Sequence, residues 1–402
     1  MDVEHLRKTV RPKIHFIANG VFSTAIAGGD IHFLKLAETA IQAGYELNFF
    51  GGHALKKVIA ERNLSATVTL TDTETMSTVS QSSLGGQFAL FQNYFRRYRR
   101  TMRLLNQIAP EDFVYAVSDG WFDALPVVHS PARRKLMVLH MEAPRLGQII
   151  ARSRPDVDAS RLASLHYWIS QEWSLRRFAR CQTKHLLYLH PLMQPRLRKI
   201  GLRAAEMTLA IGALDVAAID AVPKQTRTYD VAWIGRVHRQ KGIDDLLATF
   251  EFLARRLENF RAVLIGNLRE RLLPEVKSRN LEQHVTFSGF VSEAEKIRLF
   301  KASRTFLMPS KHEGSPRVIG ESVMAETPVV AYEIPNYRPL FGDFVRYVPP
   351  FDLAAFQAVA EREILRMRAG ENYLEKMTLA DFKRDNSWET TETKFLRALE
   401  NL

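Results

Sequence analysis

Two glutamates with seven residues between them stand in the C-terminal third of the chain. Glu313 opens the small-residue loop Gly314-Ser315-Pro316-Arg317, and Glu321 lies in an apolar segment that runs on to Pro328. The apolar run at 305–310 is typical of a buried parallel strand. A strand, a small-residue loop and a helix in this order expose backbone N–H groups at a helix N-terminus, where a phosphate can bind. We expect the two carboxylates to hold hydroxyl groups of one phosphorylated ligand.

The alternative interpretation of such a pair is two solvated acids, and it holds for most glutamates. Glu321 fits it poorly, because Val318, Ile319, Val323 and Met324 flank it. A charge among apolar neighbours needs a partner. We therefore expect Glu321 to be buried beside a polar or charged group.

Two cations stand upstream in a loop between a strand and a helix. The strand-like segment 229–234 is followed by Gly235, Arg236 and Lys241, and a helix is expected over 243–257. Arginine can hold two phosphate oxygens in a fork, and lysine adds a compact positive charge. Basic loops usually face solvent, so this signal is weak alone. Combined with the glutamate loop, it favours a diphosphate site.

These motifs resemble the retaining nucleotide-sugar glycosyltransferases of the B-type two-domain fold, specifically glycosyltransferase family 4. The resemblance spans nearly the whole chain, but its specific motifs lie between residues 229 and 332. Besides the glutamate motif, they are Gly235-Arg236…Lys241-Gly242, Val285-Thr286-Phe287-Ser288-Gly289-Phe290, Phe306-Leu307-Met308-Pro309-Ser310 and Thr327-Pro328-Val329-Val330-Ala331. Weaker matches are Ala27-Gly28-Gly29-Asp30, Gly44-Tyr45-Glu46-Leu47, His140 and Ser387-Trp388-Glu389.

The resemblance implies that the C-terminal half binds the donor. Arg236 and Lys241 would hold its diphosphate and stabilise the charge that develops as the glycosidic bond breaks. Glu313 would contact sugar hydroxyls, and Glu321 would accept hydrogen bonds from the ribose. The further donor-binding residues that it implies are Gly235, the loop Gly314, Ser315, Pro316 and Arg317, and Phe290 and Val291 beside the base.

In the N-terminal half the resemblance gives Gly28 and Gly29 an approach to the diphosphate across a cleft, and gives His140 a contact with the transferred sugar. A glycine pair alone usually serves a tight turn. A histidine at a strand end is usually structural as well. His140 follows the apolar run 136–139, however, and open parallel sheets bind ligands at the carboxyl ends of their strands.

Two positions depart from the family pattern. Glu326 stands where glycine usually follows the helix, so we expect this helix end to be closed differently. After the N-terminal glycines, Asp30-Ile31-His32 stands where an acidic pair with Arg or His is common. That loop therefore predicts no particular acceptor.

The alternation of strand-like and helix-like segments predicts an α/β protein with two doubly wound, Rossmann-like domains facing each other across a cleft. We expect an acceptor-side domain over 1–220, a nucleotide-sugar domain over 221–381 and a last segment, 382–402, whose helix crosses back. One cysteine, Cys181, excludes an internal disulfide and suits a reducing cytoplasm. With no apolar run of ~18 residues and a polar N-terminus, we expect neither a membrane span nor a signal peptide.

The positive charge is concentrated in the first half. Residues 1–220 hold 28 Lys and Arg against 19 Asp and Glu, a net of +9 out of +12 for the chain. The stretch 91–105 interleaves aromatics with arginines and could lie on an anionic membrane through Arg96, Arg97, Arg99 and Arg100. The equal alternative is a solvated basic face whose aromatics pack inward. No zinc spacing or nucleic-acid-binding motif accompanies it, so nucleic acid is not an expected partner.

The sequence predicts no metal and no other cofactor. Asp156-Val157-Asp158 has the spacing of a metal-binding acid pair, but its flank is polar, so we expect a loop or helix cap. The cations of the loop can stabilise a leaving diphosphate instead.

The predicted function is transfer of a sugar from a nucleotide diphosphate to a hydroxyl acceptor with retention, on a lipid-linked or cell-surface glycan precursor. The enzyme would work in the cytoplasm or on the cytoplasmic face of a membrane. The alternatives are a nucleotide-sugar epimerase, a phosphorylase, a non-catalytic nucleotide-sugar-binding protein, and a transferase with a small soluble acceptor.

Overall fold

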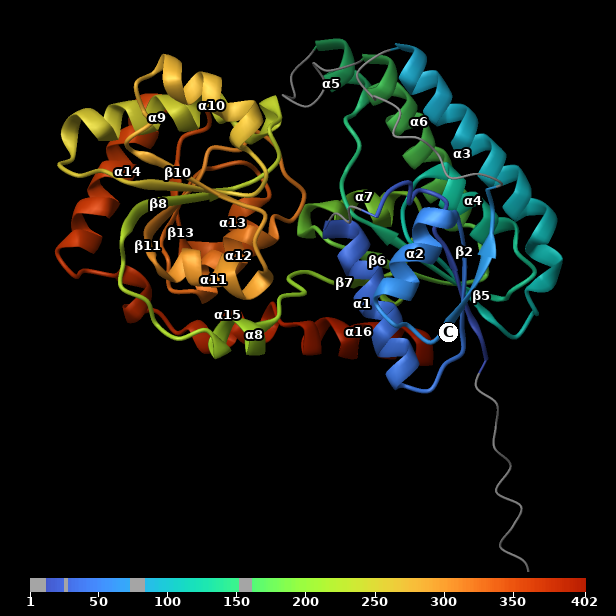
Figure 1. Cartoon of the computed structure of the whole chain (residues 1–402). Coiled ribbons are helices and arrows are strands. Elements are labelled where there is room, and N and C mark those ends of the chain that lie inside the picture. Colours follow the sequence, from blue (N-terminus) through green and yellow to red (C-terminus); the bar gives the residue numbers. More distant parts are fainter. Residues whose placement is uncertain (1–11, 25–27, 73–83, 152–160) are drawn as a thin grey trace, which may run out of the picture.

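Two parallel sheets, each covered by helices on both faces, form two lobes that lie side by side in Figure 1. The computed structural model describes residues 12–24, 28–72, 84–151 and 161–402. The first sheet has the order β3-β2-β1-β4-β5-β6-β7 and the second the order β10-β9-β8-β11-β12-β13, and all neighbouring strands in both run parallel. The predicted fold class, two doubly wound domains, is confirmed.

The first sheet ends with β7 at residue 209, and the helix after it, α8, packs on the second domain. The strands of the first sheet are β1 (Ile14–Ile17), β2 (Leu47–Gly51), β3 (Ala66–Leu70), β4 (Phe113–Ala116), β5 (Arg134–Leu139), β6 (Thr183–Tyr188) and β7 (Met207–Leu209). The helices between and after them are α1 (Gly28–Gln42), α2 (His53–Glu61), α3 (Leu84–Leu104), α4 (Trp121–His129), α5 (Leu146–Ala151), α6 (Arg161–Phe178), α7 (Gln194–Lys199) and α8 (Val216–Ala221).

The second sheet repeats the pattern. Its strands are β8 (Tyr229–Ile234), β9 (Ala262–Ile265), β10 (Val285–Gly289), β11 (Ser303–Met308), β12 (Val329–Tyr332) and β13 (Val345–Val348). Its helices are α9 (Ile243–Arg256), α10 (Arg269–Ser278), α11 (Glu293–Lys301), α12 (Arg317–Met324), α13 (Tyr337–Phe341), α14 (Leu353–Arg368) and α15 (Leu379–Asp385). The strand expected at 305–310 thus begins and ends two residues earlier than predicted.

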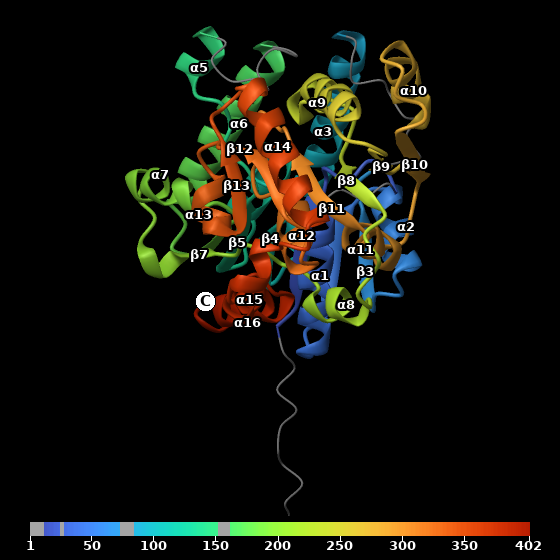
Figure 2. The same ribbon diagram turned by 90° about the vertical axis from the view of Figure 1, so that its left-hand side faces the viewer.

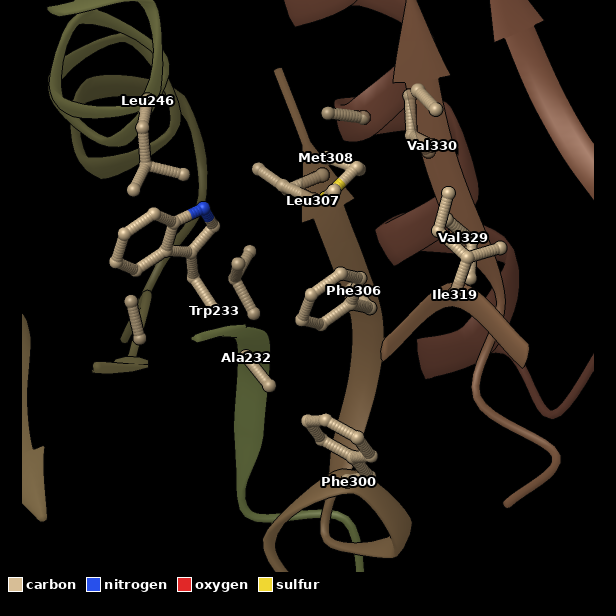
Figure 3. Close-up of a cluster of buried hydrophobic side chains, with 14 of the residues drawn as sticks. Ala232, Trp233, Leu246, Phe300, Phe306, Leu307, Met308, Ile319, Val329 and Val330 are labelled. Carbon is tan, nitrogen blue, oxygen red and sulfur yellow. The ribbon is translucent and has the colours of Figure 1, made fainter. Parts of the chain in front are cut away.

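The apolar runs of the second domain form a continuous core under its loops. Trp233 of β8, Phe306 of β11 and Ile319 of α12 are buried and lie in one cluster (Figure 3). Because both faces of a doubly wound parallel sheet are covered, its strands are apolar throughout rather than alternating. The core therefore fixes the carboxyl ends of β8 and β11, from which the two predicted donor loops emerge.

The last helix, α16 (Trp388–Glu400), lies beneath the first lobe, and α15 before it lies beneath the second (Figures 1 and 2). Ser387 forms an isolated parallel bridge with Leu214, and the buried Phe395 and Leu399 pack into the core of the first domain. The chain therefore crosses between the domains at two places, in the segment between β7 and α8, which packs against α11 and α12, and at the start of α16.

Helix α12 closes in the ordinary way despite the glutamate at its end. Glu326 has a φ of +57°, which is the left-handed conformation that glycine usually supplies. Its carbonyl oxygen accepts hydrogen bonds from Arg227 Nη2 at 2.8 Å and Asn372 Nδ2 at 2.9 Å. The expectation of a different closure was wrong, because these contacts hold a strained residue in the usual geometry.

Candidate donor-binding cleft

The two predicted donor loops are tied to each other by backbone contacts. Gly242 has a φ of +66°, and a Cβ at this position would clash with the carbonyl oxygen of Pro309. The Lys311 N–H donates to the carbonyl oxygen of Gln240 at 2.8 Å, and the Gln240 side-chain amide donates to the carbonyl oxygen of His312. Only a residue without a side chain permits this approach, and it brings the arginine–lysine loop against the glutamate loop.

Lys241 and Glu313 meet as a result. Lys241 Nζ lies 2.5 Å from Glu313 Oε1, and the side chains are 18% and 11% exposed. The Asn336 side-chain amide donates to the carbonyl oxygens of Glu313 and Gly314 and thus fixes the loop from the opposite side. No sequence motif marks Asn336, because its contacts are with backbone carbonyls.

Arg236, on the same loop as Lys241, lines a cavity of about 600 Å³. Gly235 lines the same cavity, as do Asn267 and Arg271, which follow β9. Asn267 Oδ1 accepts a hydrogen bond from the Phe290 N–H at 3.1 Å, and the Phe290 side chain is 85% exposed. The cavity therefore joins the predicted phosphate cation to the loop predicted to meet the base.

Glu321 is buried and does have a charged partner. Lys296 Nζ of α11 lies 2.9 Å from Glu321 Oε2 and 2.6 Å from Glu293 Oε2. Burial alone lowers the pKa of Lys296, but the two carboxylates outweigh it and raise that pKa above its ordinary value. Glu321 Oε2 is itself buried, and the lysine holds it in place. The sequence predicted a partner but not this lysine.

Arg317 begins α12 and reaches towards the first domain. Its Nη2 lies 3.7 Å from Glu321 Oε1, and its guanidinium carbon lies 5.7 Å from the ring centroid of Trp388. The ring centroid of His32, on α1, lies 5.9 Å from that of Trp388, and the ring centroid of His140 lies 6.0 Å from that of His32. Burial, followed by the charges of His140 and Arg317, lowers the pKa of His32 to about 3. A series of side-chain contacts thus connects Arg317 of the second domain, through Trp388 and His32, to His140 of the first.

The residues predicted on the first domain lie at the other side of the cleft. A Cβ on Gly29 would lie 3.4 Å from the His140 ring, while Gly28 has open space around it. A Cβ on Gly314 would lie 2.9 Å from Met141 Cγ and 3.2 Å from the carbonyl oxygen of His140. The glutamate loop therefore touches the chain directly after β5, so the two sets of predicted residues do come together.

His140 is held from behind by groups that the sequence analysis missed. Its Nε2 lies 3.1 Å from the carbonyl oxygen of Val117, a geometry in which Nε2 donates. Gln171 Nε2 donates to the carbonyl oxygen of Met141 and to Asp119 Oδ2, both at 2.8 Å. Asp119 is buried, and this burial raises its pKa. These contacts come from α6 and the end of β4, far from His140 in sequence.

The basic stretch on α3 is divided between the interior and the surface. Arg97 is buried, and its guanidinium donates to the carbonyl oxygens of Asn19 and Val21 and pairs with Asp72 at 2.8 Å. Its place among the predicted membrane-facing arginines was wrong, because these internal carbonyls and a carboxylate hold it. The remaining three, Arg96, Arg99 and Arg100, are exposed.

The described residues also bear on metal binding and on membrane spans. Among the described residues no three His, Cys, Asp or Glu side chains gather as a metal site would require. Asp156-Val157-Asp158 lies outside the described residues. Over the same part of the chain no helix combines the length and apolar composition needed to cross a membrane.

The domain that carries the two donor loops also matches a known family. Residues 217–373 match the family Glycosyl transferases group 1. The matched stretch includes Arg236, Lys241, Glu313, Glu321 and Lys296, and therefore both lysine–glutamate pairs.

Individual relatives match less than half of this chain. An alpha-D-kanosaminyltransferase from Streptomyces kanamyceticus is 27% identical over 150 residues, or 35% of this chain and 39% of that protein. The O-antigen chain mannosyltransferase B from Escherichia coli is 26% identical over 183 residues, or 42% of this chain and 47% of that protein. The chain thus spans less than half the length of these two relatives. Neither is named as an epimerase, so they lend that alternative no support.

Among solved structures, HepE from Anabaena in complex with UDP-glucose is similar over both domains. It covers 97% of this chain and 100% of its own, with a TM-score of 0.68 and 15% sequence identity. At this identity the likeness concerns the fold, which is that of the B-type glycosyltransferases.

Proposed function

We propose that the protein is a retaining glycosyltransferase of family 4 that moves a sugar from a nucleotide diphosphate to a hydroxyl acceptor. The observation that carries this proposal is that the loops after β8 and β11 meet at the carboxyl ends of these strands, where Lys241 pairs with Glu313 and Arg236 lines a cavity beside Gln240. Ligands of open parallel sheets bind at this end. The family match of residues 217–373 supports the donor side of the proposal.

The donor diphosphate would lie between Arg236 and Lys241. Lys241 is paired with Glu313, and a phosphate oxygen can replace the carboxylate as its partner because both groups stand on loops. Glu313 is then free to accept hydrogen bonds from sugar hydroxyls. Glu321 would accept hydrogen bonds from the ribose, and Phe290 and Val291 would meet the base, since the Phe290 N–H donates to Asn267, which lines the cavity.

In the proposed reaction the bond between the anomeric carbon and the phosphate oxygen breaks, and the acceptor oxygen bonds to the same face of that carbon. The acceptor proton passes to the leaving phosphate oxygen. Arg236, Lys241 and the N-terminus of α12 would stabilise the charge on the diphosphate, so we propose no metal in this step. His140, held by Val117, would contact the transferred sugar from the first domain.

The proposed acceptor is a lipid-linked or cell-surface glycan precursor, presented at the cytoplasmic face of an anionic membrane. The net +9 of residues 1–220 and the exposed Arg96, Arg99 and Arg100 support it. The O-antigen mannosyltransferase among the relatives acts on a glycan chain by its name, while the kanosaminyltransferase keeps a small acceptor as the second candidate.

Two measurements test the proposal. Thermal shifts with UDP-, GDP- and ADP-sugars should show one nucleotide family stabilising the protein, since ligands that bind the native state raise its stability. Labelled donor without acceptor should be hydrolysed slowly, whereas a rearranged sugar would indicate an epimerase and dependence on inorganic phosphate a phosphorylase. With acceptor, NMR of the product should show the anomeric configuration of the donor. Inversion, or stabilisation by no nucleotide, would contradict the proposal.

A further inference from the structure

The exposed apolar side chains of the protein are concentrated in one place. Twelve large hydrophobic side chains are exposed among the described residues, and eight of them lie on α3, α5 and α6. These three helices lie together at one end of the first domain, at the top of both Figure 1 and Figure 2. Scattered exposed apolar residues need no explanation, but a gathered patch marks a surface that binds something.

On α3 the apolar and basic residues follow one another along the helix. Phe88, Phe91 and Phe95 are exposed, and their spacing of three and four residues puts them on one face. The exposed arginines, Arg96, Arg99, Arg100 and Arg103, come in the turns that follow. The buried Arg97 and Thr101 stand on the opposite side, towards Asn19. The outer face of α3 is therefore apolar in its first half and cationic in its second.

Helix α6 has the same order. Leu162, Ile169 and Trp173 are exposed on one face, and Arg176 and Arg177 follow in the last turn. The two helices meet where the Phe91 ring lies 5.6 Å from the His166 ring. One turn earlier on each helix stand Phe88 and Leu162, which are 64% and 67% exposed. The two apolar ends thus lie beside each other.

Helix α5 adds to the same end of the domain. It packs against α6, and it exposes Leu146 and Ile150, the latter to 69%. Neither α3 nor α5 contains an acidic residue, and the one acid of α6, Glu172, is paired with Arg176 and Arg196. The surface therefore combines apolar side chains with cations that no acid on these helices neutralises, apart from Arg176.

We propose that α5 and the parts of α3 and α6 that precede their exposed arginines insert their exposed apolar side chains into an anionic lipid bilayer, while the arginines that follow bind its phosphate groups. An interfacial helix buries its apolar face ~5–10 Å into the headgroup boundary, which suits this order of apolar residues and arginines. The uncompensated positive charge favours an anionic surface over a second copy of the chain, because two such faces would repel each other.

The position of the surface relative to the cleft gives it a use. Helix α5 begins soon after His140 and Met141, which touch the glutamate loop of the second domain. A bilayer at α5 would bring the headgroup of a lipid-linked acceptor towards this side of the cleft. This use rests on the proposed sugar transfer, whereas vesicle binding rests only on the membrane part of the proposed function, so the two can fail separately.

The test is sedimentation of the full chain with vesicles of phosphatidylglycerol and phosphatidylcholine, and with phosphatidylcholine alone, at two salt concentrations. The protein should sediment with the anionic vesicles and be released as salt rises. Phe88→Ser with Leu162→Ser should weaken binding ~10-fold or more, because two apolar side chains lose their burial. The matched control is Leu192→Ser with Leu365→Ser, at two side chains that are each 47% exposed elsewhere, and it should bind like the wild type.

A second measurement locates the inserted face. Trp173 is exposed on α6, so bromine atoms on lipid acyl chains should quench its fluorescence, and Trp173→Phe should remove most of that quenching. Failure of the wild type to bind anionic vesicles at low salt would overturn the proposal, as would equal loss in the control double variant. A dimer that dissociates in the Phe88/Leu162 variant, without vesicle binding, would overturn it in favour of a second copy.

Discussion

Two lysine–glutamate pairs in the second domain have the same chemistry and different surroundings. Lys241 and Glu313 stand on two loops at the cleft, whereas Lys296 and Glu321 stand on α11 and α12, with side chains 9% and 6% exposed. A loop pair can separate when a ligand offers another partner. A helix pair cannot move without moving its helices, and breaking a buried pair by removing one partner leaves an uncompensated charge.

The difference explains how one domain can offer the same ligand both a contact that rearranges on binding and a contact that is fixed in advance. In our proposal the diphosphate replaces Glu313 beside Lys241, and the ribose meets a Glu321 that Lys296 already holds in place. The first pair would thus act in catalysis, and the second would position the nucleotide. Each prediction below tests one side of this contrast.

The largest effect should come from the cations of the loop. Arg236→Ala or Lys241→Ala should reduce kcat/KM by at least ~10²-fold, as expected on removal of one preorganised charge stabiliser. Circular dichroism should be unchanged, because both residues stand on a loop outside the core. Arg255→Ala, an exposed arginine on α9, is the control and should retain activity. Wild-type activity in either loop variant would remove the basis for a diphosphate between these residues.

The two glutamates should separate by role. Glu321→Gln should weaken binding of the sugar-free nucleotide diphosphate by ~10-fold or more, since hydrogen bonds to charged groups contribute ~1.5–3 kcal/mol. Glu313→Gln should leave that binding nearly intact and depress turnover, because it acts on the sugar. Titration calorimetry with the nucleotide and steady-state kinetics with the donor give both numbers. Equal losses in the two variants would erase the contrast between the pairs.

Lys296 should act through Glu321. Lys296→Met removes the cation, so the buried carboxylate takes up a proton more readily, and nucleotide affinity should fall ~10-fold and weaken further at lower pH. Lys296→Arg should restore part of it. Glu293→Gln is the matched control, because Glu293 is the other partner of the same lysine and its side chain is 78% exposed. This variant should keep the nucleotide affinity of the wild type.

The outcomes distinguish this idea from the proposed function. Should Glu321→Gln weaken the nucleotide while Lys296→Met does not, the lysine has no positioning role. Should neither change it, the ribose contact itself is wrong.

Much of this site follows from the sequence, and what does not follow has a common physical cause. The apolar strands and the two donor loops are local patterns, so the fold class and the candidate residues of the second domain could be predicted. Lys296, Asn336 and Asp119 could not, because their partners are brought together by tertiary packing. Arg97 shows the same limit, since internal carbonyls of a distant segment, rather than its own helix pattern, decide that it is buried.

The smallest predicted effect concerns the end of α12, the helix that carries Glu321. Glu326 holds a left-handed φ of +57°, which costs a residue with a Cβ ~1–2 kcal/mol relative to the right-handed region. Glu326→Gly should relieve this strain at the cost of a more flexible unfolded chain, a net gain of ~0.5–1 kcal/mol in the free energy of unfolding. Glu326→Ala keeps the Cβ and should gain nothing, which separates backbone strain from loss of the side-chain charge. Urea unfolding of the three proteins gives the differences.

Nucleotide affinity should be the same in all three, because Lys296, rather than the helix end, fixes Glu321. A weaker affinity in the glycine variant would show instead that the strained end of α12 helps to place that carboxylate.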